Sequence, residues 1–292
     1  MFTQLFGNYL LNRGLVTSSQ LSAALSAAKQ TRAKLGVLAI NAGYMNAAQV
    51  DEVHNEQQRI DKRFGDIAVD KGYLSPGQVE ELLTKQGHAH LQLGQALVDN
   101  GAMTNSSFAE ALSSYKSENS LTDVDFDDKT GNKVDELIGK LYSFADAENS
   151  SVYTEYVSLL FKNLIRFIGD DFTPLAPEKI PSARVSFCAK QDLKGLGFSC
   201  STMMDTSEQA FIAFASRFAG EQFTDADEMT EAANLEFMNL HNGLYAVNLS
   251  NDEGQEITLL PPTCEKDTVV GGPVYRISVV YPFGTAAFYI TV

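Results

Sequence analysis

Apolar and polar positions recur every 29 residues along the first 115 residues of the chain. Each period holds a glycine, a pair of apolar residues, a second glycine, a polar residue and then a stripe of apolar residues. We call the four periods copies 1 to 4. Self-similarity at this spacing predicts a repeated helical unit. The first glycines are Gly7, Gly36, Gly65 and Gly94, and the second are Gly14, Gly43, Gly72 and Gly101.

Each copy predicts two helices with a sharp boundary between them. The second glycine ends the first helix at a positive φ, and the polar residue after it caps the second helix. A glutamine follows the first three caps at the capping-box spacing, and Ser107 holds that place in copy 4. The caps are Thr17, Asn46, Ser75 and Thr104, and the glutamines are Gln20, Gln49 and Gln78.

The second helix of each copy carries an apolar face that it cannot bury alone. Apolar residues stand four apart on this face, so neighbouring copies should pack together. His54 takes the same position in copy 2, and we expect its imidazole to be partly buried. The apolar pairs are Leu21 with Leu25, Val79 with Leu83, and Phe108 with Leu112.

Residues 116–149 are predicted to form an acidic linker between two domains. The alternating aspartates of this segment also suggest a calcium loop. Asp128, however, stands where such a loop needs glycine, and Val134 stands where it needs glutamate. A solvated linker is therefore the prediction. A short amphipathic helix follows, with apolar residues at Val134, Leu137, Ile138 and Leu141.

Residues 150–292 alternate between helix-like and strand-like patterns, which predicts an α+β domain with helices covering an antiparallel sheet. The last strand, 286–292, could pair with another chain if it lies at a sheet edge, which makes a homodimer one option. The expected helices are 152–168, 207–219 and 225–247, and the expected strands are 183–189, 197–202, 256–260, 274–281 and 286–292, with a turn at 192–195.

Composition narrows the possible functions. The chain has 292 residues, 44% of them apolar, and a net charge of −15, which predicts a globular protein that does not bind nucleic acid. No apolar run is long enough to span a bilayer and the first residues lack a secretory pattern, so we expect no membrane insertion and a cytoplasmic location. Cys188, Cys200 and Cys264 should be reduced thiols. No metal site is expected, and His88 and His90 should face solvent.

The residues with the clearest chemical potential lie on the predicted long helix. Glu236 and Asn239 are three apart, so they project from one face, and Gly243 leaves open space one turn further on. His241 and Asn242 point around the helix from Asn239 and are expected at the surface. Glu236 and Asn239 taken alone could equally be solvated helix residues without a function.

The spacing Glu-x-x-Asn-x-x-x-Gly, followed by Pro262 after Asn239, resembles the CheX/CheC/FliY family of chemotaxis phosphatases over about residues 150–292. The resemblance implies dephosphorylation of a CheY-type receiver domain, which itself carries Mg²⁺. Glu236 would pair with the receiver's lysine, and Asn239 would orient the attacking water. Ala232 departs from the Asp or Ser common in the family. Glu155 is followed by Ser158, so the resemblance implies one site per chain.

The four copies resemble the MshEN domain of type II secretion and pilus ATPases, as two modules at 5–57 and 63–115. Members of that family bind cyclic di-GMP through an opening Arg and a closing Gln. The complete pair here is Arg63 with Gln86, and the nearest substitute is Lys34 with Gln57. The remaining pairs of such positions are Leu5 with Ala28 and Gln92 with Tyr115.

These patterns leave two functions open. The first is a cytosolic signalling enzyme, an aspartyl-phosphate phosphatase without a cofactor of its own, whose repeats serve regulation or docking. The second is a non-catalytic adaptor whose repeats report cyclic di-GMP to a chemotaxis, pilus or secretion assembly. Glu236 and Asn239 favour the enzyme, and Ala232 with the incomplete repeat motifs favours the adaptor.

Overall fold

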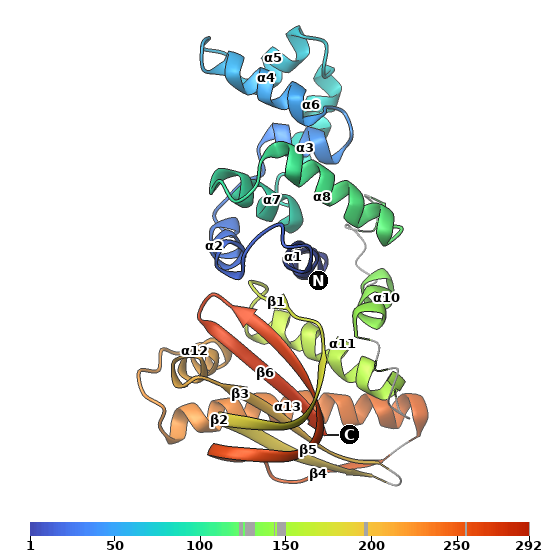
Figure 1. The fold of residues 1–292 in the computed structure, drawn as a ribbon, viewed down its shortest axis with the longest axis vertical. Helices are drawn as coiled ribbons and strands as arrows, with labels where there is room; N and C mark the ends of the chain where they lie inside the picture. The colour runs from blue at the N-terminus through green and yellow to red at the C-terminus, as the bar shows by residue number, and fades with distance from the viewer. Residues whose placement is uncertain are drawn as a thin grey trace. The chain divides into compact units, whose positions relative to one another are not determined.

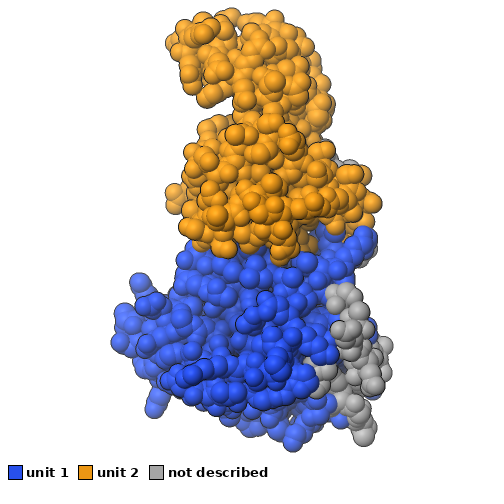
Figure 2. All heavy atoms as spheres, in the orientation of Figure 1, with its two compact units in different colours: residues 1, 134–292 blue, residues 2–133 orange. Residues whose placement is uncertain are grey.

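The structure is a computed structural model, and it describes residues 1–122, 125, 132–142, 144, 150–195, 198–254 and 256–291. The chain forms two compact units, which Figure 2 shows in different colours. The repeat unit contains residues 2–133, and the C-terminal unit contains residues 134–292 together with Met1. The boundary between the units falls inside the predicted linker, 116–149. Among the described residues, no helix has both the length and the apolar character needed to cross a bilayer.

Each copy forms the two predicted helices (Figure 1). The first helices are α1 (Phe2–Asn12), α3 (Leu35–Asn41), α5 (Phe64–Asp70) and α7 (Ala89–Asp99), and the second are α2 (Ser18–Ala28), α4 (Ala47–Gln57), α6 (Pro76–Thr84) and α8 (Asn105–Glu118). All four capping boxes form, including the one that Ser107 completes in copy 4. The second glycines have φ angles from +64° to +73°, which confirms their role at the helix boundary.

The first glycine of a copy lies where the second helix touches the first. A Cβ on Gly36 would lie 2.6 Å from Cγ1 of Val50, and one on Gly94 would lie 2.3 Å from the Phe108 ring. At Gly65 the nearest atoms would be 3.2 Å away. These glycines let the two helices of a copy approach closely.

The copies do not pack in sequence order. Copy 1 packs on copy 4, mainly through α2 and α7, and copy 2 packs on copy 3 through α4 with α5 and α3 with α6. Copies 2 and 4 also meet, through α4 with α8 and α3 with α7. The main contacts therefore follow the order 1–4–2–3, whereas the predicted modules would pair copy 1 with copy 2 and copy 3 with copy 4. Repeated units present similar apolar faces, so the side chains that differ between copies decide which faces meet.

Copies 2 and 3 meet through reciprocal contacts. Tyr44 of copy 2 donates a hydrogen bond to Glu81 of copy 3 (2.9 Å), and Tyr73 of copy 3 donates one to Glu52 of copy 2 (2.6 Å). The two tyrosines are 29 residues apart, and so are the two glutamates, so each interaction is the image of the other. Equivalent units make such a reciprocal contact when they meet through the same face.

Three side chains of the repeats lie differently from expectation. His54 is exposed, and Leu83 is 47% exposed while its neighbour Leu82 is fully buried. Copy 3 packs on copy 2 through the Leu82 side of α6, which leaves the Leu83 side in solvent. His90 is buried where solvent exposure was expected, and this burial lowers the pKa of its imidazole to about 3.

The C-terminal unit has the expected α+β composition. Helices α12 and α13 pack on each other and on the sheet, and α11 packs on α13. The predicted amphipathic helix, α10, docks on α11, where its Asp135 accepts a hydrogen bond from Ser158 (2.6 Å). The elements are α10 (Asn132–Leu141), α11 (Ser150–Phe167), β1 (Thr173–Pro174), β2 (Glu178–Gly195), β3 (Phe198–Thr206), α12 (Glu208–Ala219), α13 (Glu228–Glu253), β4 (Ile257–Leu259), β5 (Thr263–Tyr281) and β6 (Gly284–Thr291).

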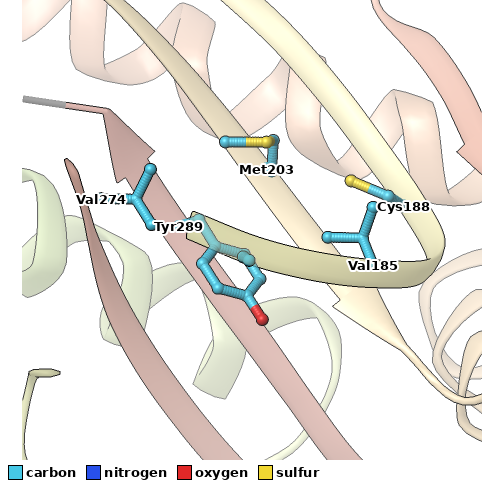
Figure 3. Packing of buried hydrophobic residues seen from close by; sticks show 6 residues of the cluster. Val185, Cys188, Met203, Val274 and Tyr289 are labelled. Carbon is cyan, nitrogen blue, oxygen red and sulfur yellow. The ribbon is translucent and has the colours of Figure 1, made fainter. Parts of the chain in front are cut away.

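The sheet closes on itself through its long strands. Its order is β1-β5-β6-β3-β2-β4, all neighbours are antiparallel, and β5 also pairs with β2. Strands β5, β6, β3 and β2 therefore form a ring. One core cluster takes residues from all four of these strands, and Figure 3 shows how they pack. Its members are Ala183, Val185, Cys188, Met203, Val274 and Tyr289.

Strands β2, β3 and β5 extend several residues beyond their predicted limits, and β6 lies inside the sheet. The expected turn at 192–195 lies within β2, which continues to Gly195 and pairs there with Phe198 of β3. The first part of β5 is a strand although many of its residues are exposed, because it bonds to the backbone of β2. Strand β6 pairs with β3 on one side and β5 on the other. The condition under which the last strand could pair with another chain, a position at a sheet edge, is therefore not met.

Candidate functional site

Helix α13 presents one face to the core and the opposite face to solvent. Asp227 caps its start, where it accepts a hydrogen bond from the backbone nitrogen of Thr230 (3.0 Å). The buried residues of the helix recur at spacings of three and four, which fixes its rotation against the sheet. They include Asn234, Phe237, Met238, His241, Asn242, Tyr245 and Leu249.

Glu236 lies on the solvent face, in the middle of an apolar stripe. Met229, two turns before Glu236, and Val247, three turns after it, are 62% and 56% exposed. Half-buried Leu240 lies one turn from Glu236 on the same face. Within the described residues, the carboxylate of Glu236 forms no hydrogen bond or ion pair. A free carboxylate on an exposed helix face that also carries apolar side chains is suited to meet a cation on another protein.

Asn239 is half-buried, and its carboxamide is held by the sheet. Its Oδ1 accepts a hydrogen bond from Nε2 of Gln191 in β2 (2.9 Å). The same Nε2 donates to the carbonyl oxygen of Leu260, just after β4 (2.9 Å). Nδ2 of Asn239 is left without a hydrogen bond to any described residue. Glu236 and Asn239 thus share one helical turn, with one side chain free and the other anchored.

The anchor continues into a buried polar network. Oε1 of Gln191 accepts a hydrogen bond from Nδ2 of Asn242 (2.8 Å), which also donates to Oγ1 of Thr202 (2.9 Å). Oδ1 of Asn242 accepts one from the hydroxyl of Tyr156 in α11 (3.1 Å). Asn242 is fully buried, so its expected surface position is wrong. Buried amides persist in a core when their donors and acceptors are satisfied in this way.

His241 is also fully buried, against the expectation of a surface group. Nδ2 of Asn163 lies 3.0 Å from its Nδ1, and because an amide nitrogen donates, Nδ1 is the acceptor and the ring proton sits on Nε2. The ring packs edge-on against Tyr156 (4.5 Å between centroids). Burial lowers its pKa to about 3, so the imidazole is neutral near pH 7 and does not act as an acid there.

The remaining motif residues lie around this turn. A Cβ on Gly243 would be 3.9 Å from Cδ1 of Leu259, an ordinary van der Waals contact, so a side chain of β4 borders the helix where open space was predicted. Pro262 directly precedes β5, two residues after the Leu260 carbonyl that binds Gln191. Ser158, in the place of a second motif, is bonded to Asp135 of α10. Within the C-terminal unit, the candidate motif is therefore the one on α13.

A second candidate site lies in the repeats. Three of the four residues suggested for cyclic di-GMP line one cavity of about 650 Å³, namely Lys34, Gln57 and Gln86. Arg63 is exposed and is not among the residues that line it. The pairing differs from the predicted one because copies 2 and 3 face each other: Nε2 of Gln86 donates to the carbonyl of Ala33, beside Lys34 (3.2 Å).

The charge in this cavity is neutralised within the protein. Nζ of Lys34 lies 2.7 Å from Oδ1 of Asp99, and both are lining residues. Nε2 of Gln95 donates to the same carboxylate oxygen (2.9 Å). The rest of the wall is partly apolar, with Leu35, Val50 and Phe64. An anionic ligand would therefore have to compete with Asp99 for the lysine.

The equivalent space between copies 4 and 1 is filled by side chains. Phe6 packs against Phe108 (6.3 Å between ring centroids) and against Tyr115 (5.2 Å). These residues stand 58 positions from their counterparts in copies 2 and 3, where smaller or polar side chains leave the cavity. The counterparts are Val50 for Phe108, His54 for Leu112, Gln57 for Tyr115 and Phe64 for Phe6.

Several solved structures are similar to about half of this chain. A chemotaxis protein CheX from Desulfovibrio desulfuricans shares 18% identity over 48% of this chain and 97% of its own, with a TM-score of 0.42. A CheC-like protein from Shewanella sp. PV-4 shares 18% identity over 49% and 97%, with a TM-score of 0.44. A chain of the CheX–CheY–BeF3–Mg complex from Borrelia burgdorferi shares 15% identity over 48% and 96%, with a TM-score of 0.39. No known protein family and no curated protein matches the sequence.

Proposed function

We propose that the C-terminal unit binds a phosphorylated receiver domain of the CheY type and hydrolyses its aspartyl phosphate. The observation that carries this proposal is the pairing of a free carboxylate, Glu236, with an anchored carboxamide, Asn239, on one exposed turn of α13. The motif Glu-x-x-Asn-x-x-x-Gly supplies the reaction class through its resemblance to the chemotaxis phosphatases.

In this mechanism the two side chains contribute position and not acid–base chemistry. Glu236 pairs with a lysine of the receiver and fixes the orientation of the complex. Asn239 holds a water molecule whose oxygen attacks the phosphorus in line with the bond to the aspartate. That bond breaks, and the products are the free aspartate and inorganic phosphate. The Mg²⁺ and the charge that stabilise the phosphoryl group belong to the receiver, and alignment of the water lowers the entropic part of the barrier.

The apolar stripe around Glu236 supports a protein partner. Met229 and Val247 together with half-buried Leu240 would be covered in the complex, which also removes water around the Glu236 carboxylate. A desolvated ion pair contributes more than an exposed one once both partners are hydrogen-bonded. We therefore expect truncation of Glu236 to weaken binding, and truncation of Asn239 to slow the reaction.

The test follows the decay of receiver phosphate as a function of protein concentration. Asn239→Ala should lower the maximal rate constant about 100-fold while the half-saturating concentration stays within about threefold. Glu236→Ala should raise the half-saturating concentration about tenfold or more. Asn248→Ala and Glu221→Ala, which truncate exposed residues of the same types elsewhere in the unit, are the matched controls.

A non-catalytic adaptor is the second candidate, favoured by Ala232 in place of the family's polar residue. An adaptor binds the phosphorylated receiver through the same stripe but leaves its phosphate lifetime unchanged. Saturable binding with equal decay rates for the wild type and Asn239→Ala would establish the adaptor and remove the phosphatase.

We further propose that the cavity lined by copies 2, 3 and 4 is a regulatory ligand site, with cyclic di-GMP as the first compound to test. Its support is a hollow of about 650 Å³ lined by Lys34, Gln57 and Gln86. Calorimetric titration of the full chain should give a saturable signal that Val50→Phe with Gln57→Tyr abolishes, because these changes copy the filled arrangement of copy 4. A signal that survives this double change, or the absence of any saturable signal, would refute the ligand site. The repeats would then be interpreted as docking surfaces.

A further inference from the structure

We propose that Gln191 is a positioning residue that fixes the polarity of the Asn239 carboxamide, so that Nδ2, a donor, is the atom available to the receiver's active site. This inference rests on the phosphatase function proposed above and adds the direction in which its amide works. The observation behind it is a chain of buried hydrogen bonds that begins and ends on backbone carbonyls.

The first carbonyl sets the orientation of the glutamine. The carbonyl oxygen of Leu260 can only accept, so the atom of Gln191 that lies 2.9 Å from it must be Nε2. An amide nitrogen carries two hydrogens, and the second one is directed at Asn239, also 2.9 Å away. Asn239 must therefore offer its oxygen at this contact. Its nitrogen is left at the other end of the carboxamide.

The backbone carbonyl of Gln191 fixes the orientation of the Gln191 side-chain amide independently. Oγ1 of Thr202 lies 3.3 Å from the backbone oxygen of Gln191 and donates its hydroxyl proton there. Thr202 can then accept from Nδ2 of Asn242, which sends its other hydrogen to Oε1 of Gln191. The hydroxyl of Tyr156 completes the arrangement by donating to Oδ1 of Asn242. Both ends of the network thus place Nε2 of Gln191 toward Asn239.

Burial makes this orientation difficult to reverse. Gln191 is 1% exposed, and Thr202 and Asn242 are fully buried, so water does not readily replace a lost partner. Turning the Asn239 carboxamide over would set its Nδ2 against Nε2 of Gln191, two donors facing each other in the interior. An unpaired buried donor is costly, so one orientation dominates.

The fixed polarity limits what Asn239 can do to the attacking water. Nδ2 donates, so it holds the water through a lone pair on the water oxygen or contacts a phosphoryl oxygen. It cannot take a proton from the water. In this arrangement the proton passes to an oxygen of the phosphoryl group or to a carboxylate of the receiver.

The test compares the full-length wild type with Gln191→Met, which keeps the length of the side chain and removes both hydrogen-bonding ends. Phosphate decay of the receiver is measured under single-turnover conditions across protein concentrations. We expect the maximal rate constant to fall about tenfold, because the carboxamide loses its preferred orientation, while the half-saturating concentration stays within about twofold. A role in stability alone would reduce the folded fraction and leave the maximal rate per folded molecule unchanged.

A second measurement, made on the wild type, tests the inference even if the variant fails to fold. Side-chain amide protons followed by NMR should exchange slowly with solvent at Gln191 and rapidly at Asn239. Protected Asn239 protons, or a Gln191→Met protein with the full maximal rate, would overturn the inference. A wild type that does not speed decay at all would instead refute the phosphatase proposal, and the inference with it, so the two failures are distinguishable.

Discussion

Replacing Gly94 with alanine should destabilise the repeat unit although alanine is the better helix former. A Cβ at this position would lie 2.3 Å from the ring of Phe108, which is fully buried. Phe108 is held by Phe6, whose ring centroid is 6.3 Å away, so the ring cannot swing into solvent. The new methyl group must therefore push α7 and α8 apart.

The expected size of the effect follows from two opposing terms. Alanine in place of glycine in a helix contributes about 1 kcal/mol of stability. Overpacking of a tight core costs about 3 kcal/mol at this degree of overlap. The net loss is about 2 kcal/mol, and at about 3 °C per kcal/mol for a unit of this size the melting temperature should fall by about 6 °C.

Two other glycines provide matched controls on the same scaffold. Gly77 lies in the first turn of α6 with no atom within 4 Å of its added Cβ, so Gly77→Ala should be neutral or slightly stabilising. At Gly65 the nearest atoms would be 3.2 Å away, so Gly65→Ala should fall between the other two. The assay is thermal and urea unfolding of the full chain followed by far-ultraviolet circular dichroism, which suits a protein with no tryptophan. A Gly94→Ala protein as stable as Gly77→Ala would refute the packing argument.

Two further perturbations test the C-terminal unit. The pKa of His241 is lowered to about 3 in the folded state, so below about pH 6.5 the unfolded chain binds a proton that the folded chain does not, and stability should fall by about 1.4 kcal/mol per pH unit toward pH 3. Urea unfolding at several pH values measures how the free energy of unfolding depends on pH. His241→Gln should reduce the number of protons taken up on unfolding by one, and an unchanged slope of this free energy against pH would contradict the prediction. Arg217 bonds both oxygens of buried Asp171 (2.6 and 2.9 Å), so Arg217→Leu should destabilise by about 2 kcal/mol. Lys140→Ala, which breaks an exposed pair with Glu136, should change stability by less than about 0.5 kcal/mol, and equal effects of the two changes would count against burial as the cause.

Helices and their boundaries followed from the sequence because the interactions that set them are local. Each capping box joins residues three apart, and each second glycine acts through its own φ angle. The face that a helix buries was predictable where one partner covers it, as for Leu21 and Phe108. It was not predictable for Leu83, whose exposure depends on which copy lies beside α6.

Strand limits depended on partners that the sequence does not specify. The first part of β5 alternates poorly between apolar and polar residues, yet it pairs with β2 over most of its length. The last strand was predicted as a strand, but its place between β3 and β5 could not be known. Pairing is decided by backbone hydrogen bonds between distant segments, which leave little trace in the local pattern.

Glu236 and Asn239 were identified from their spacing on a helix, but the residues that hold Asn239 were not. Gln191 and Thr202 come from strands that precede α13 by many residues, and Tyr156 comes from α11. One signal was present: Gln191 stands in the buried register of β2, between Ala189 and Leu193. A polar residue in an otherwise apolar register predicts that its side chain has a hydrogen-bond partner in the core, but it does not identify that partner.

The sequence by itself determined the four helical copies, their caps and the turn that carries Glu236 and Asn239, because these depend on residues within one or two helical turns of each other. Only the tertiary structure decided that copy 1 meets copy 4, that copies 2, 3 and 4 line a cavity, and that Gln191 donates a hydrogen bond to the Asn239 carboxamide. Such features depend on which of several chemically similar surfaces pack together. That choice is made by the fit and hydrogen bonding of side chains far apart in the chain.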